Sequence, residues 1–500
     1  MPNDELTPAR FGEAFMAFLD DMHRQTAVTG ATLAGRVQQH LGTDVTSLPV
    51  TTEQFDPVDQ PNVQVALDSY IADIDPAARL IGIGGEQKQY VTSVLSAILG
   101  HGGMSGMRGI GEGPVDYINF HLAEGQTLPC VQHGLFLLND GTAPLAVAVL
   151  GPSSMHGPRQ QVQVEVVSVD PARGSIFLRE LRDRMRRLNV YRGHVLSLDP
   201  GRLDMGAQPL VAFHDLPNIS RDDLVLPEAI LKRIERHTIA FSEHADALKA
   251  SGRSLKRGML LHGIPGTGKT LTLMYLVGQM HDRTVLLTTG LGMGLLSPVM
   301  QMARALAPSI VVLEDVDLIA EERGNPFARG GGLLFELLNE LDGLESDVDV
   351  IFALTTNRPD VLEPALAARP GRVDLAVEFP IPDLDARTRL LTLYAKGLTL
   401  VDVDLHDLAS EIDGASPAYI EELLRREAVI AADDSGTLVV TDQYIDLARE
   451  DLAGGGALGR KLLGFRHDGE QDTPSGFPGF PMTSPRFPED FRGELNDRDA

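Results

Sequence analysis

Residues 258–270 read GMLLHGIPGTGKT, and this stretch decides the fold class of the chain. Residues 259–261 form a short apolar run, as in a buried strand, and residues 271–280 continue as an apolar helix. Between them the pattern G-x-x-x-x-G-K-[ST] is met without deviation, in the strand–loop–helix context that a phosphate-binding loop requires. The alternative is a glycine-rich loop before a buried helix, which the flanking context disfavours.

The chemistry of this loop predicts ATP and Mg²⁺ as its ligands. Glycines let successive backbone N–H groups point at phosphate oxygens, and the helix N-terminus adds positive potential. Lys269 is expected to reach the β- and γ-phosphates, and Thr270 to place its hydroxyl on Mg²⁺. The predicted nucleotide-binding residues are Gly263, Ile264, Pro265, Gly266, Thr267, Gly268, Lys269, Thr270 and Leu271.

Two further apolar runs end in polar residues. Residues 309–317, SIVVLEDVD, read as a strand that ends at Glu314 and Asp315, and residues 350–357 end at Asn357. In phosphoryl transfer one carboxylate holds Mg²⁺ through water and the other orients or deprotonates the attacking water. Asn357 is a candidate to bond the γ-phosphate or that water. The alternative is a buried strand that ends in solvated acids.

A Pro-Gly turn carries two arginines, Arg369 and Arg372, with little nearby to pair them. Guanidinium groups placed in this way suit contacts with phosphate oxygens of a nucleotide held by a neighbouring subunit. The alternative is a surface turn with solvated arginines.

Four segments taken together resemble AAA ATPases (ATPases associated with diverse cellular activities): RGMLLHGIPGTGKT, LAPSIVVLEDVD, LLNELDGL and TTNRPDVLEPALAARPGRVDL. The resemblance covers about residues 218–450, and the last segment is similar to the second region of homology of that family. It implies a ring, usually a hexamer, with nucleotide at the subunit interfaces. It also implies an α/β core followed by a small helical lid, in which residues 414–416 resemble the start of the helix that closes over the base and ribose.

The resemblance assigns roles to the residues already singled out. Lys269 and Thr270 match the Walker A motif, and Glu314 and Asp315 match Walker B, with Glu314 at the metal. Asn357 matches sensor 1. The arginine fingers of the family match Arg369 and Arg372.

Two departures bear on activity. The family usually has Asp then Glu at the strand end, whereas this chain has Glu314 then Asp315, which moves each carboxylate by about one methylene and predicts altered geometry and slower turnover. The same order occurs in the AAA group that moves the folded Rieske protein across the mitochondrial inner membrane. Residues 289–295 lack the aromatic pore-loop residue of threading members, which argues against processive threading.

Patterns along the chain predict four regions. Residues 1–215 are an α/β or α+β domain of unknown type, with a hairpin at residues 139–141 and a half-buried strand at 162–166. Residues 216–384 are the P-loop α/β core with a parallel sheet, and residues 385–453 are the helical lid. Residues 454–500 are rich in Gly, Pro and Phe and are expected to be a disordered tail.

Composition limits the partners. The chain has 43 basic and 70 acidic residues and a net charge of −27, so nucleic acid and membrane are not expected as partners despite an arginine-rich helix near residues 173–192. No signal peptide or apolar stretch of membrane-spanning length is visible, which predicts a cytoplasmic protein. The leading hypothesis is a Mg²⁺-dependent ATPase that forms a homo-oligomeric ring, a hexamer, and remodels an unidentified protein client. The alternative is a nucleotide-gated assembly scaffold with slow or absent hydrolysis.

Overall fold

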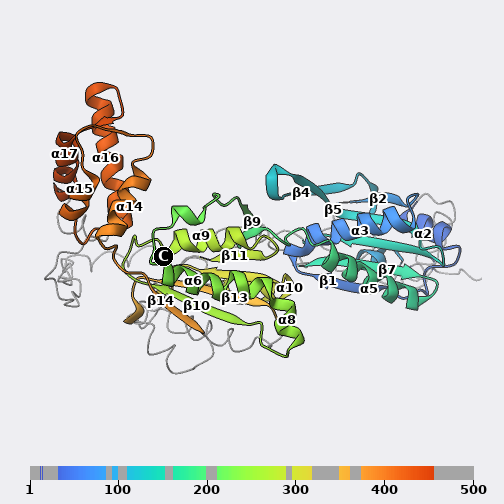
Figure 1. The fold of residues 1–500 in the computed structure, drawn as a ribbon. Coiled ribbons are helices and arrows are strands. Elements are labelled where there is room, and N and C mark those ends of the chain that lie inside the picture. The colour runs from blue at the N-terminus through green and yellow to red at the C-terminus, as the bar shows by residue number, and fades with distance from the viewer. Residues whose placement is uncertain are drawn as a thin grey trace, which may run out of the picture. The chain divides into compact units, whose positions relative to one another are not determined.

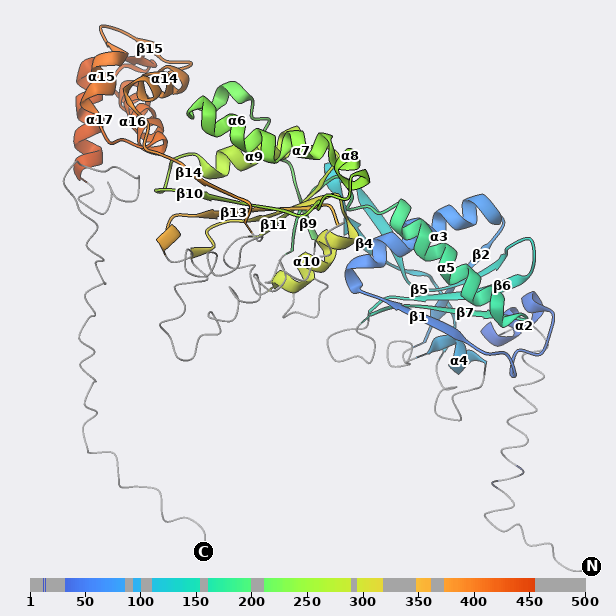
Figure 2. The same ribbon diagram turned by 60° about the horizontal axis from the view of Figure 1, so that its bottom comes forward.

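The computed structural model describes residues 32–85, 93–99, 110–152, 161–198, 211–288, 295–317, 348–360 and 373–454, together with residues 12 and 14. The chain forms two compact units, Met1–Pro380 and Ile381–Ala500. Two separate seven-stranded sheets lie in the first unit (Figures 1 and 2). Apart from its first residue, the predicted tail lies outside the described residues.

The first sheet is antiparallel throughout, with strand order β1-β7-β6-β5-β2-β3 and with β4 paired to β5. Its strands are β1 (Thr51–Phe55), β2 (Arg79–Gly84), β3 (Gly111–Gly113), β4 (Asp116–His121), β5 (Thr127–Asn139), β6 (Pro144–Leu150) and β7 (Val162–Ser168). The predicted hairpin joins β5 to β6, where Gly141 has a φ of 78°. The Asp140 carboxylate accepts hydrogen bonds of 2.8 Å from the backbone amides of Thr142 and Ala143, which fixes the turn.

Helices cover both faces of this sheet. They are α2 (Leu33–Leu41), α3 (Gln60–Ile74), α4 (Val94–Ile98) and α5 (Pro171–Arg187), with 3₁₀ turns at Pro57–Asp59 and Ala123–Gly125. Helices α3 and α5 pack on one face, where the rings of Tyr70 and Phe177 meet edge to face at 4.9 Å. Residues of α2 and α4 pack on the other face.

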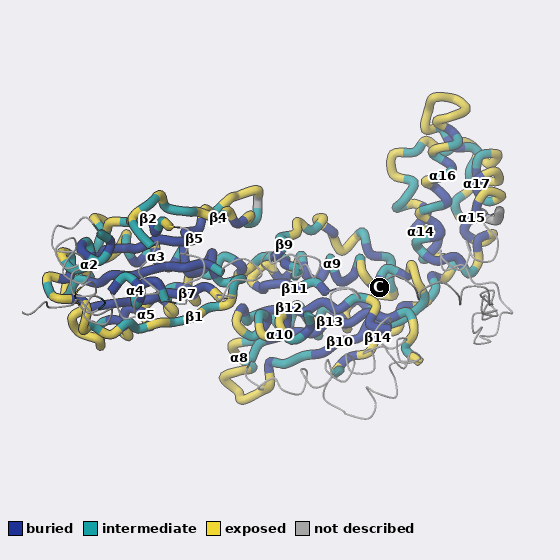
Figure 3. Tube along the Cα trace, turned by 180° about the vertical axis from the view of Figure 1, so that it is seen from behind, coloured by how far each residue is buried: buried dark blue, intermediate teal, exposed yellow. Residues whose placement is uncertain are grey.

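Strand β7 differs from the sequence prediction. Alternation of valines predicts a half-buried strand, but every residue of Val162–Ser168 is buried (Figure 3). The reason is the double cover, because Val164 faces the core with α3 and α5 while Val167 faces the core with α2 and α4. The polar residues of β7 are buried with hydrogen bonds instead of being solvated: Glu165 accepts from the backbone amide of Leu95 at 2.6 Å.

The second sheet is the P-loop core, with strand order β14-β10-β13-β12-β11-β8-β9. Its strands are β8 (Val195–Leu198), β9 (Val211–His214), β10 (Arg257–His262), β11 (Thr284–Thr288), β12 (Ser309–Leu313), β13 (Val350–Thr356) and β14 (Leu375–Glu378). All neighbours pair in parallel except β8 and β9, which form an antiparallel hairpin. The predicted α/β class with a parallel sheet is therefore confirmed.

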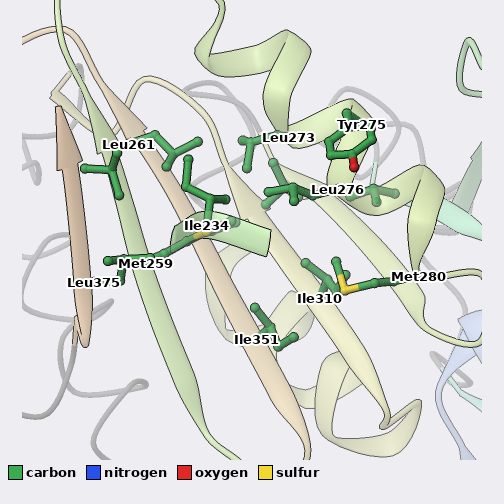
Figure 4. Packing of buried hydrophobic residues seen from close by; sticks show 14 of the residues in the cluster. Ile234, Met259, Leu261, Leu273, Tyr275, Leu276, Met280, Ile310, Ile351 and Leu375 are labelled. Carbon is green, nitrogen blue, oxygen red and sulfur yellow. The ribbon is translucent and has the colours of Figure 1, made fainter. Parts of the chain in front are cut away.

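Helices lie on both faces of the second sheet. They are α6 (Glu228–His237), α7 (Ile239–Glu243), α8 (Ala245–Ala250), α9 (Lys269–Gln279) and α10 (Leu296–Ala305), with a 3₁₀ turn at Arg221–Asp223. Residues of α6 and α9 pack against strand residues such as Leu261 and Ile310 (Figure 4). Met300 and its α10 neighbours pack on the opposite face against Val311 and Phe352. Burial on two faces explains why these strands read as continuous apolar runs.

The border between the first two regions lies earlier than the sequence places it. Residues 1–215 are grouped as one N-terminal domain by sequence pattern, but β8 pairs in parallel with β11 and β9 pairs with β8. Both strands therefore belong to the P-loop sheet, and the last element packed on the first sheet is α5. Strands of four residues carry little signal of which sheet they join, because a few apolar side chains indicate burial but not the core in which they are buried.

The second unit is mainly helical. Its elements are α14 (Leu384–Tyr394), β15 (Thr399–Leu400), α15 (Leu405–Glu411), α16 (Pro417–Ser435), β16 (Val439–Val440) and α17 (Asp442–Gly454). The Ser416 hydroxyl accepts a hydrogen bond from the amide of Tyr419 and caps α16, and Pro417 is its first residue. The buried guanidinium of Arg387 donates to the carbonyls of Ala409 and Pro382 at 2.8 and 2.9 Å, which ties α14 to the residues around α15.

Arg283 ties the amino ends of three P-loop strands together, and its removal is expected to destabilise the first unit. It is 2% exposed, pairs with Asp349 through two bonds of 2.8 Å, and donates to the Ser309 carbonyl. Arg283→Ala leaves the Asp349 carboxylate, which is only 15% exposed, without its guanidinium partner and should lower the free energy of unfolding by about 3–5 kcal/mol in urea titrations. Arg186→Ala, which removes an exposed ion pair with Asp183, is the control and should change it by less than about 0.5 kcal/mol. Equal effects of the two variants would contradict the assignment.

Glu427 is a buried carboxyl group in α16 whose two oxygens have no hydrogen-bond partner among the residues that the structure describes. Burial raises its pKa from 4.5 to about 8. The folded state therefore binds more protons than the unfolded state between these values, so its contribution to stability is present at low pH and is lost as pH rises towards 8. Glu427→Gln should stabilise α16 more at pH 8 than at pH 5, measured by hydrogen exchange corrected for the intrinsic rate. Glu421→Gln, at an exposed position of the same helix, should show no such pH dependence.

Candidate active site

The loop between β10 and α9 has the backbone of a phosphate-binding loop. Gly263, Gly266 and Gly268 have φ values of 145°, 75° and 93°, which residues other than glycine rarely adopt. A Cβ atom on Gly263 would lie 2.6 Å from the carbonyl oxygen of Phe379, so glycine is required there by space as well as by conformation. The hydroxyl of Thr267 donates to the Ile264 carbonyl at 2.9 Å and closes the loop from within.

The lysine and threonine of the motif occupy different environments. Lys269 is 6% exposed, and its Nζ donates to the carbonyls of Gly263 and Ile264 at 2.8 and 2.9 Å. Burial lowers the pKa of Lys269 to about 8, and the nearby carboxylates of Asp315 and Asp317 act in the opposite direction. Thr270 is exposed at the start of α9, where its hydroxyl is open to a ligand. The loop therefore offers an exposed hydroxyl and an ammonium group on its two sides.

The register of the parallel strands brings the other candidates to this loop. His262 at the end of β10 lies opposite Thr356 of β13, and Leu313 at the end of β12 lies opposite Leu354. The loop that starts at Gly263 and the residues after β12 and β13 therefore leave the same edge of the sheet. In open α/β folds ligands bind at this edge.

The two acidic residues after β12 are held differently. The Glu314 amide donates to the Thr288 carbonyl at 3.0 Å, and its side chain is half-buried. Asp315 has a φ of 51°, in the left-handed region, and its amide donates to the Thr355 hydroxyl at 3.0 Å. The exposed Asp315 carboxylate accepts a hydrogen bond of 3.0 Å from the Asn357 side-chain amide. The structure thus brings Asp315 and Asn357 together.

Asp317 is a site residue that sequence reasoning missed. It is 6% exposed, and its carboxylate accepts hydrogen bonds from the Thr356 hydroxyl at 2.9 Å and from the Asn357 amide at 3.2 Å. The sequence signal is the position of Asp317, two residues after Asp315, but the sequence does not show which polar groups would satisfy the acid.

Some predicted site features lie outside the described residues. These are Arg369 and Arg372, the segment LLNELDGL, and residues 289–294 of the predicted pore loop.

The arginine-rich helix is α5, and several of its arginines face acids of the same chain. Arg184 donates to Asp73 at 2.5 Å, Arg182 pairs with Glu53 at 2.6 Å, and Arg173 pairs with Asp140. Intramolecular pairing of these side chains favours the interpretation of a structural helix over that of a nucleic-acid surface.

Comparison with known proteins agrees with this geometry. Residues 259–381 match the family described as "ATPase family associated with various cellular activities (AAA)". These residues are an AAA domain. The match begins inside β10 and contains the P-loop, both acidic residues and Asn357.

Curated relatives match about half of the chain or somewhat more. The chain is 33% identical over 266 residues to the ATP-dependent zinc metalloprotease FtsH 3 of Synechocystis, covering 51% of this chain and 42% of the relative. It is 27% identical over 307 residues to the 26S proteasome regulatory subunit 8 homolog of Schizosaccharomyces pombe, covering 57% and 72%. The chain thus spans about two fifths of the length of the FtsH relative.

Among the described residues, no helix is both long and apolar enough to cross a bilayer. They also contain no group of three His, Cys, Asp or Glu side chains arranged to hold a metal ion.

Gly263→Ala tests the conformation of the AAA domain's phosphate-binding loop. The new methyl group would meet the Phe379 backbone, and the residue would be held at a φ of 145°, which costs about 1–3 kcal/mol. We expect ATP affinity to fall by at least ~10-fold in equilibrium binding of a fluorescent nucleotide. The control is Gly278→Ala in α9, where a Cβ atom meets nothing within 4 Å; it should leave binding intact and stabilise the helix by up to about 1 kcal/mol. Unchanged ATP affinity in Gly263→Ala would contradict the requirement for glycine at this position.

Proposed function

We propose that the chain is a Mg²⁺-dependent ATPase that assembles into a ring and couples hydrolysis to remodelling of a protein partner. The observation that carries the proposal is the hydrogen bond of 3.0 Å between Asn357 and Asp315, at the sheet edge where the P-loop starts. A lone P-loop argues only for phosphate binding. A carboxylate paired with an amide at the same edge adds the groups needed to orient a water molecule.

The residues of the AAA domain have separate roles in the proposed reaction. Lys269 neutralises charge on the β- and γ-phosphates, and the loop amides between Gly263 and Gly268 cradle them. Asp315 and Asn357 together orient the attacking water, with Asp315 as the base.

The donor set fits magnesium. An exposed hydroxyl at Thr270 and a carboxylate at Glu314 are hard oxygen ligands of the kind Mg²⁺ takes beside nucleotide phosphates. When bound, the ion would neutralise charge that develops on the phosphate oxygens. Thr270 and Glu314 would hold it, the latter through water.

Completion of the site by a neighbouring subunit is the second part of the proposal. Arg369 and Arg372 serve as arginine fingers in a hexameric ring of AAA domains. The names of the relatives, an ATP-dependent protease and a proteasome regulatory subunit, support a protein client over a nucleic acid. In this proposal the core begins with β8 and β9 and runs to residue 384, residues 385–453 are the lid, and the region before β8 selects the client.

A nucleotide-gated scaffold is the second candidate, and the acidic pair favours it. Asp315 stands where the family usually has the longer glutamate, and its carboxylate already bonds Asn357. If this shorter side chain does not reach the water, ATP binds and drives assembly without turnover.

ATP turnover per subunit, measured against protein concentration, separates the two candidates. An arginine finger contributes roughly 10³–10⁵ in rate, so dilute subunits should be nearly inactive and turnover per subunit should rise steeply with concentration. Lys269→Ala serves as the blank and should not bind ATP. Tight ATP binding without turnover at any concentration would favour the scaffold.

Mixing two inactive variants tests completion of the site between subunits. Arg372→Ala should bind ATP without turning it over, and Lys269→Ala still carries Arg372. A mixture should regain activity that neither variant has alone, because Lys269→Ala subunits supply the missing arginine. Arg179→Ala, at an exposed position of α5, is the matched control and should behave as the unaltered chain. A mixture without activity would remove Arg372 from the finger role.

A further inference from the structure

We propose that Asp317 is a positioning residue that sets where Asn357 points, and through Asn357 sets the carboxylate of Asp315. The inference rests on the proposed function, since it concerns the water-orienting pair of that site. Asp317 itself does not touch the nucleotide in this proposal.

The contacts of Asp317 carry the inference. Its Oδ1 atom accepts two hydrogen bonds from consecutive residues of β13 and its following turn: the Thr356 hydroxyl at 2.9 Å and the Asn357 backbone amide at 3.2 Å. A third bond continues the chain, because the Arg358 amide donates to the Thr356 hydroxyl oxygen at 2.9 Å. One carboxylate oxygen therefore fixes the turn in which Asn357 lies.

Burial makes these bonds consequential. Asp317 is 6% exposed and Thr356 is fully buried. If the hydrogen bond between them is lost, bulk water cannot readily replace either partner, so the loss is costly. Asp317 also acts on Lys269, whose pKa it raises against the effect of burial. A buried acid at this place thus has both its hydrogen-bond donors and a nearby cation.

The two turns at the sheet edge are tied to each other on both sides. Asp317, after β12, holds the backbone at Asn357 after β13, while Thr355 of β13 accepts from the backbone of Asp315. The Val316 amide donates to the Thr355 carbonyl at 3.0 Å and extends the pairing of the strands. Between these ties, the side chains of Asn357 and Asp315 meet at 3.0 Å. Loss of the hydrogen bonds to Asp317 releases the turn that holds Asn357, one partner of that pair.

Small displacements at such a pair have large effects, because a shift of about 1 Å in a group that orients a reactant can cost ~10²-fold in rate. The left-handed backbone of Asp315, with a φ of 51°, is held by its neighbours and not by its own preference. Asp317 therefore affects kcat without contributing an atom to ATP binding.

The test compares four variants in the full-length chain. Asp317→Ala and Thr356→Val each remove one side of the 2.9 Å bond and should lower kcat by about 10–100-fold with little change in ATP affinity. Asp317→Asn keeps an oxygen that accepts from both donors, and Thr356→Ser keeps the hydroxyl, so each should recover most of kcat. Asp349→Asn is the matched control: it alters an acid at the opposite end of β13, and should lower stability and leave kcat unchanged.

A second readout does not depend on turnover. Hydrogen exchange of residues 350–360 in the protein without nucleotide reports on the Asn357 amide. Protection of that amide should be lost in Asp317→Ala and retained in Asp317→Asn. If Asp317→Ala fails to fold, the pair Thr356→Val and Thr356→Ser still tests the bond through kcat.

Each outcome decides between explanations. Wild-type kcat in Asp317→Ala, or unchanged amide protection there, overturns the positioning role. Equal loss of kcat in Asp317→Asn and Asp317→Ala, with protection retained in the former, would assign the effect to the negative charge and overturn the inference as well. Absence of turnover in the unaltered chain would instead defeat the proposed ATPase, while the exchange experiment would still decide whether Asp317 holds the turn.

Discussion

The parallel register of β10, β12 and β13 is the constraint on which the candidate site depends. It fixes the ends of these strands at one edge of the sheet, so the P-loop, the acidic pair and Asn357 meet although about 90 residues separate the first from the last in sequence. No single side chain produces this meeting. It follows from backbone hydrogen bonds whose pairing is held by apolar burial on both faces of the sheet.

The two sheets place their polar groups differently. In the first sheet the chain places polar groups inside: Gln64 accepts from the Val131 amide at 2.9 Å and Gln60 donates to the Val131 carbonyl at 3.1 Å. These helix side chains satisfy the backbone of β5 beyond the end of its pairing with β6. In the second sheet the strand interiors are apolar and the polar groups gather at the ends. The second arrangement places polar side chains together at one edge of the sheet.

Sequence reasoning predicted the P-loop, the parallel core and the helical unit, because each depends on local pattern. The P-loop needs glycine at three positions with positive φ, and these glycines are visible in the sequence. A strand that is covered on both faces is visible as a continuous run of apolar residues. The same reasoning underestimated the burial of β7, since alternation records one face only and Glu165 looks solvated until its partner Leu95 is known. The role of Asp317 was out of reach for a related reason: its donors lie about 40 residues away, and their approach depends on how two turns bend. The border near residue 215 was misplaced because β8 and β9 have only four residues each, too few for their pattern to show which core they join.

The contacts of Arg283 affect how the strands of the P-loop sheet are held together. It precedes β11 directly, bonds the carbonyl at the start of β12 and pairs with the acid just before β13, so a single side chain fastens three strands at one end. The opposite ends of the same strands carry the turns of the AAA site and have no comparable fastening through one group among the described residues. The site edge is held instead by separate contacts between pairs of strands, such as those of Asp317 with Thr356 and Asn357. Loss of one of these contacts leaves the others in place, whereas loss of Arg283 releases the amino ends of three strands together.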